Sequence, residues 1–147
     1  MQRQFLEREL AQRMLPLARG WQQLADQALS ELRVSHSTGW CLIYLHRLGP
    51  EARQIDLAQE IGISQPSVVR ALDQLEAGGL VERTPHPEDR RSNRLGLTPQ
   101  GKALVGKIEA KLRALRHDLL HDVPDTDMET MLRAFDILST RIAQKRA

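Results

Sequence analysis

The stretch LAQEIGISQPSVVRAL, residues 57–72, decides the fold of this chain because two helical patterns meet in it across a tight turn. Gly62 is suited to end the first helix, and Ser64 is suited to cap the second. Pro66 lies in the first turn of the second helix, where its missing N–H group costs no hydrogen bond. Ala58 is small enough for the two helices to approach closely. The stretch therefore predicts a helix-turn-helix.

The exposed side of the second helix offers side chains that bind base edges or phosphates of DNA. An ordinary corner between two helices of an all-helical protein has the same pattern, so this stretch alone leaves both interpretations open. The candidate DNA-binding residues on this helix are Ser64, Gln65, Pro66, Ser67, Arg70 and Gln74.

A β-hairpin is predicted after this helix, because the apolar period changes to two in residues 80–86 and 94–98. A helix-turn-helix followed by a hairpin is a winged helix, and its loop is the charged stretch of residues 87–94. Three arginines and two acidic residues give this loop a net charge of only +1, so a solvated turn is the alternative interpretation. The place beside the second helix favours DNA, because an arginine at a hairpin tip can enter the minor groove. The candidate wing contacts are Asp89, Arg90, Arg91 and Arg94.

Two shorter helices are predicted before the turn. Ser35 or Ser37 can cap the first of them, which ends at Gly49-Pro50. The second is QIDLAQEIG, residues 54–62, and its apolar side chains are expected to face inward. These side chains are Ile55, Leu57, Ala58 and Ile61.

Long apolar stripes flank this central part on both sides. Residues 4–33 repeat apolar side chains every three or four positions, as one long helix interrupted by Pro16, and two more helices follow residue 98. Stripes this long need more partner surface than one small core offers, which indicates a second chain. The expected dimer-interface residues are Phe5, Leu6, Leu10, Leu115, Leu119, Phe135 and Leu138.

The predicted fold class is mainly α with a small β-hairpin. A winged helix-turn-helix of residues 35–98 is flanked by dimerisation helices in residues 1–34 and 99–147. The 147 residues are 41% hydrophobic and 27% charged, as in a globular protein, and no apolar run is long enough to span a bilayer. The charged N-terminus and the single Cys41 predict a reducing cytoplasm.

No enzyme and no cofactor are expected, because no nucleophile–base set, phosphate loop or metal-ligand spacing is visible. Four acids on the short helices are interpreted as exposed helix-face charges, namely Asp56, Glu60, Asp73 and Glu76. Cys41 falls in a predicted buried helix without a nearby cation, which favours an inert hydrophobic side chain over a redox sensor.

Residues 62–101 resemble the winged-helix core of the MarR family of transcriptional regulators. The resemblance is carried by a D-x-R wing motif, Asp89 and Arg91, and by an L-T-x-x-G motif that begins at Leu97. QPSVVRALDQLE (residues 65–76) and the placement of the two tryptophans resemble the SlyA-like branch in particular. The sequence departs from the family at Gly96, where a strand-forming residue is more usual.

The resemblance implies a homodimer whose first and last helices interleave and which binds a pseudo-palindromic double-stranded DNA operator. It implies repression or opposition to silencing, and in many members release from DNA by small aromatic carboxylates or phenols. By position, Arg70 is carried over as a recognition-helix contact and Arg91 as a minor-groove contact. A winged-helix module that binds another protein instead of DNA is the alternative function.

A small aromatic effector would bind where the first helix meets the winged domain. Four residues fall near this junction, and an arginine beside aromatic rings suits a carboxylated ring. Tryptophans on helical stripes are more often core residues, so both interpretations stay open. The candidate ligand-binding residues are Arg19, Trp21, His36 and Trp40.

Overall fold

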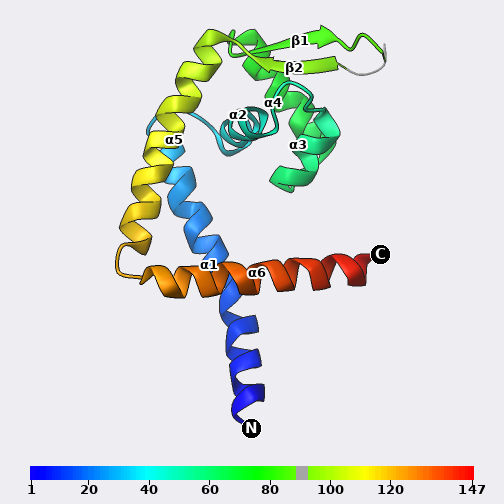
Figure 1. Cartoon of the computed structure of the whole chain (residues 1–147). Coiled ribbons are helices and arrows are strands. Elements are labelled where there is room, and N and C mark those ends of the chain that lie inside the picture. Colours follow the sequence, from blue (N-terminus) through cyan, green and yellow to red (C-terminus); the bar gives the residue numbers. More distant parts are fainter. Residues whose placement is uncertain (89–92) are drawn as a thin grey trace. The chain divides into compact units, whose positions relative to one another are not determined.

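The computed structural model describes residues 1–88 and 93–147 (Figure 1). It confirms a mainly helical fold with one antiparallel hairpin, arranged as a winged helix-turn-helix with a long helix before it and two after it. The elements are α1 (Gln2–Ser30), α2 (His36–Leu48), α3 (Gln54–Ile61), α4 (Gln65–Ala77), β1 (Val81–Pro85), β2 (Asn93–Leu97), α5 (Pro99–Leu120) and α6 (Asp125–Arg146). They divide into two compact units, residues 1–115 and 116–147.

One hydrophobic core joins α2, α3, α4, the hairpin and α5 as far as Leu112. Its largest fully buried side chains include Leu42, Ile43, Leu57 and Leu72. Helix α1 buries only Ala25 and Leu29, near its C-terminal end, in this core. Most of α1 therefore takes no part in the core of its own chain.

The helix-turn-helix has the local structure that its sequence predicts. Gly62 has a φ of 77°, and its N–H donates to the carbonyl oxygen of Ala58 at 3.0 Å, which ends α3. Ser64 caps α4, since its Oγ accepts a hydrogen bond from the N–H of Ser67 at 3.3 Å. Ser35, rather than Ser37, caps α2 in the same way.

The hairpin pairs five residues of each strand without interruption, from Val81 opposite Leu97 to Pro85 opposite Asn93. Gly96 lies opposite Glu82 within this register, so a glycine at this position is compatible with a regular ladder. Val81 and Leu95 turn their side chains into the core. The two strands of the wing are therefore fixed to the body by apolar packing.

Two sequence-based expectations about the helices were wrong. Ile55 was expected to face inward, but its side chain is 46% exposed, because it lies two residues before Leu57 on the opposite face of α3. The first helix ends at Ser30 instead of residue 33, since residues 31–33 form turns and Arg33 has a φ of 59°.

Helix α6 buries none of its residues within the chain. Apolar side chains exposed on it are Met131, Leu132, Phe135, Ile137, Leu138 and Ile142. Helix α1 is similar, with Phe5, Leu6, Leu10, Met14, Leu15, Leu17 and Leu24 exposed. None of the helices described is both long and apolar enough to cross a bilayer.

Candidate nucleic-acid interface

The exposed face of α4 brings together the residues predicted to contact DNA. Ser64, at the cap, and four residues of α4 are exposed, while Ser67 is half-buried. The hydroxyls of Ser64 and Ser67 lie 2.8 Å apart, and Arg70 Nη2 donates to Ser67 Oγ at 3.3 Å. This row of donors and acceptors can bind base edges and phosphates. The four exposed residues are Gln65, Pro66, Arg70 and Gln74.

Val69 extends this face and is not among the contacts that the sequence predicts. It precedes Arg70 on α4, and its side chain is 37% exposed. A branched apolar side chain on a recognition helix can contact the methyl group of thymine. The helical period could have indicated this exposure, because Val69 lies between buried Val68 and exposed Arg70.

Glu51, between α2 and α3, contacts the loop end of the wing. Glu51 Oε1 lies 3.4 Å from Arg94 Nη2, and its Oε2 lies 3.8 Å from His86 Nε2. Arg94, predicted as a DNA contact, thus already has a carboxylate partner, and its Nε is buried. The other predicted wing residues, Asp89, Arg90 and Arg91, lie outside the described residues.

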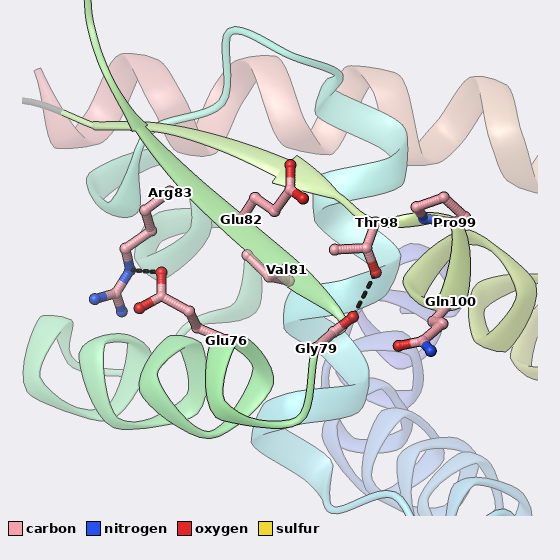
Figure 2. Close-up of a pocket in the computed structure, with 8 residues that line it drawn as sticks. All are labelled: Glu76, Gly79, Val81, Glu82, Arg83, Thr98, Pro99 and Gln100. Atoms are coloured by element: carbon pink, nitrogen blue, oxygen red, sulfur yellow. Dashed lines mark hydrogen bonds and ion pairs between the residues drawn. The ribbon is translucent and has the colours of Figure 1, made fainter.

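Two of the acids interpreted as exposed helix-face charges lie on α4, where they are exposed and also form ion pairs with the wing. Arg83 of β1 places Nη2 at 2.8 Å from Asp73 Oδ1 and Nε at 3.9 Å from Glu76 Oε2. Figure 2 shows the guanidinium of Arg83 lying against Glu76, while Glu82 leaves the strand on another side. The sequence does not indicate this role of Arg83, because the pairing depends on how the hairpin folds back onto α4.

Hydrogen bonds of Thr98, directly after β2, connect the wing to the turn that follows α4. Thr98 Oγ1 donates to the carbonyl oxygen of Gly79 at 2.6 Å, as Figure 2 shows. The same hydroxyl accepts a hydrogen bond from the N–H of Gly101 at 3.0 Å. The backbone N–H of Thr98 donates to the carbonyl oxygen of Leu80 at 3.1 Å. A Cβ atom on Gly101 would overlap that same carbonyl oxygen. The L-T-x-x-G motif is therefore a structural joint between the returning strand and α5.

The junction of α1 with α2 contains an acid that the sequence analysis did not consider. Asp26 Oδ1 lies 2.9 Å from His36 Nδ1 and 3.4 Å from Trp40 Nε1, which donates to it. The structure thus brings together His36 and Trp40, two of the four predicted ligand-binding residues, whose ring centroids are 6.4 Å apart. Trp21 is half-buried on α1, and Arg19 is exposed.

Cys41 is buried in α2. Burial raises the pKa of its thiol to about 11, because the thiolate loses its hydration. A protonated, enclosed thiol reacts slowly with oxidants, which supports the interpretation of Cys41 as an apolar core residue.

The fold of this chain is similar to that of several solved transcriptional regulators. Residues 34–92 match the sequence model of the MarR family. The crystal structure of the MarR family transcription regulator SP03579 is 22% identical, with a TM-score of 0.84 over 97% of this chain and 94% of that one. The transcriptional regulator PA3341 is 28% identical, with a TM-score of 0.78 over 92% and 98%. The transcriptional regulator BldR from Sulfolobus solfataricus is 25% identical, with a TM-score of 0.80 over 96% and 99%.

Proposed function

We propose that this chain, whose winged helix is similar to that of MarR-family transcription regulators, binds DNA and represses or de-silences genes as a homodimer on a pseudo-palindromic operator. The observation that carries the proposal is the exposed α4 face beside a hairpin whose loop contains arginines. Each protomer would place α4 in a major groove, with the two half-sites roughly 34 Å apart. A MepR variant from S. aureus, 23% identical, has been crystallised with an oligodeoxyribonucleotide.

Two exposed apolar helices support the homodimer. Phe5, Leu6 and Leu10 of α1 are exposed, as are Phe135 and Leu138 of α6. So large an apolar surface on a monomer costs free energy in water, and burying it against a second copy removes this cost. Leu115 differs from the other predicted interface residues, since it is half-buried and packs on the core of its own chain.

The test is selection of duplexes from a random-sequence pool by the purified chain, followed by gel-shift titration of the selected duplex. Arg70→Ala is expected to weaken binding by about tenfold or more, because one direct contact contributes about 1–3 kcal/mol. Arg113→Ala on α5 removes the same charge from an exposed position outside α4 and the wing, and it is the matched control. Equal losses in both variants would contradict readout by α4.

Salt dependence separates DNA binding from the alternative, a module that binds another protein. Six or more phosphate contacts make affinity for the duplex fall on the order of a thousandfold between about 50 and 200 mM salt. A chain that selects no sequence and shows a shallow salt dependence would favour the protein-binding alternative.

We further propose that a small aromatic ligand regulates release from DNA, and that the chain is of the SlyA-like type. A Staphylococcus aureus MarR, 18% identical, has been crystallised with salicylate and kanamycin. His36 and Trp40 offer aromatic surface at the α1–α2 junction, although Asp26 beside them disfavours a carboxylate unless the ligand displaces it from His36. Titrating salicylate against tryptophan fluorescence tests the site, and Trp40→Phe should remove most of any change.

Action through binding alone, without catalysis, is part of the same proposal. A regulator of this type works where the chromosome lies, so we place it in the cytoplasm. No group of three histidine, cysteine or acidic residues in the described part of the chain is arranged to hold a metal ion.

A further inference from the structure

We propose that Arg83 is a positioning residue for DNA binding, which neutralises the two carboxylates of the recognition helix without touching DNA itself. The proposal rests on the function proposed above, because it explains how a helix with net negative charge approaches a polyanion. The two carboxylates are those of Asp73 and Glu76, and both form ion pairs with Arg83.

The charge of α4 makes such a residue necessary. The helix carries Arg70 as its only cation and Asp73 and Glu76 as its acids, so its own balance is one negative charge. The two carboxylates are 58% and 48% exposed. Unpaired, they would repel DNA phosphates, since like charges brought together cost free energy. Arg83 brings the balance of the helix and its partner to zero.

The geometry places the guanidinium of Arg83 beside the two acids of α4. Its side chain is only 19% exposed and lies between β1 and α4. Nε and Nη2 are both buried, and neither makes a hydrogen bond within the described residues. Nη2 lies 2.8 Å from Asp73 Oδ1, and Nε lies 3.9 Å from Glu76 Oε2. Because both nitrogens are buried, a phosphate has no access to them. Figure 2 shows Arg83 beside Glu76.

The backbone around Arg83 explains why it can hold this position. β1 begins four residues after α4 ends, and Leu80 donates its N–H to the carbonyl oxygen of Leu75 at 2.9 Å. Val81 is buried in the core, and alternation along the strand places Arg83 on the same side, towards α4. Glu82, between them, projects to the other face.

The experiment compares four proteins on the duplex that the wild-type chain selects from a random pool. Arg83→Leu should weaken binding by about tenfold, because two exposed carboxylates then face the phosphates. Adding Asp73→Asn and Glu76→Gln to this variant should return the affinity to within about threefold of the wild type. Arg47→Leu is the matched control, since Arg47 also pairs with a carboxylate, Glu109 at 3.7 Å, on elements other than α4 and the wing.

Arg83→Lys separates charge from folding. It keeps the cation and should retain affinity within about threefold, while thermal unfolding of each variant shows whether the fold is intact. If Arg83→Leu binds as well as the wild type, or if removing both acids fails to restore its binding, the proposal is overturned. A wild-type chain that selects no duplex refutes the proposed function itself, which is a different result from intact binding that is insensitive to Arg83.

Discussion

Thr98 and Gly101 form one joint: the hydroxyl of Thr98 accepts a hydrogen bond from the N–H of Gly101 at 3.0 Å and donates one to the carbonyl oxygen of Gly79, in the turn after α4, at 2.6 Å. The joint lets the first turn of α5 lie directly on the backbone at Leu80. There is no room for a side chain at position 101, because a Cβ atom would overlap the carbonyl oxygen of Leu80. The wing is thereby fixed at its base by backbone contact.

Gly101→Ala is therefore expected to lower the free energy of unfolding by about 3 kcal/mol or more, since backbone must shift to admit the methyl group. Gly106→Ala is the control on the same helix. A Cβ atom there meets nothing within 4 Å, so the change should be neutral or stabilising by up to about 1 kcal/mol. Urea denaturation of both variants measures the difference, and equal stabilities would refute the close approach.

Arg94→Ala is expected to affect stability as well as DNA binding. Its Nε is buried and its Nη2 lies 3.4 Å from Glu51 Oε1, so its removal leaves the loop end of the wing without this ion pair. The pair is partly exposed, which limits the expected loss to about 1 kcal/mol or less. Arg70→Ala, at an exposed position without an ion pair among those described, should leave the urea midpoint unchanged. A midpoint for Arg94→Ala equal to that of Arg70→Ala would leave Arg94 as a pure DNA contact.

Local signals in the sequence predict the helix-turn-helix well. Ser64 and Gly62 act through contacts within four residues, so their roles follow from residue type and spacing alone. The apolar alternation of the wing is equally local, and both strands form where it indicates them. The predicted recognition face therefore appears on α4 as expected.

Contacts between distant elements could not be predicted in this way. Arg83 contacts Asp73 only because the hairpin folds back across α4. Glu51 and Arg94 form an ion pair although they lie 43 positions apart in the sequence (94 − 51). Asp26 becomes a partner of His36 for the same reason. Ile55 was misplaced because an eight-residue helix has too few apolar positions to define its buried face.

Cys41 is expected to react with a thiol reagent at about pH 8 at least a hundredfold more slowly in the native chain than in denaturant. Its pKa is raised from 9.0 to about 11 by burial, so the folded chain holds the proton more tightly than the unfolded chain. This contribution to stability is full below pH 9.0 and is lost as the pH rises towards 11. Between pH 9.0 and about 11, the free energy of unfolding should fall less for Cys41→Ala than for the wild type. Rapid native labelling would support a redox role instead.

Val69 is expected to read a thymine methyl group. Replacing thymine by uracil, one position at a time, in the selected duplex should weaken wild-type binding about fourfold at the contacted base, the free-energy equivalent of about one buried methyl group. Val69→Ala should lose this discrimination while its binding to the uracil duplex stays unchanged. If no thymine shows an effect that depends on Val69, the side chain does not read this group.

Phe135→Glu is expected to convert a dimer into monomers, as is removal of residues 1–12. Phe135 is 51% exposed on a helix that buries none of its residues in its own chain, so its ring needs a second copy to cover it. A carboxylate placed there would have to be desolvated on association, which opposes it strongly. Leu48→Glu, at an exposed apolar position on α2 outside both apolar helices, is the matched control. Sedimentation velocity should give monomers for Phe135→Glu and dimers for Leu48→Glu, whereas a dimer in both would place the interface elsewhere.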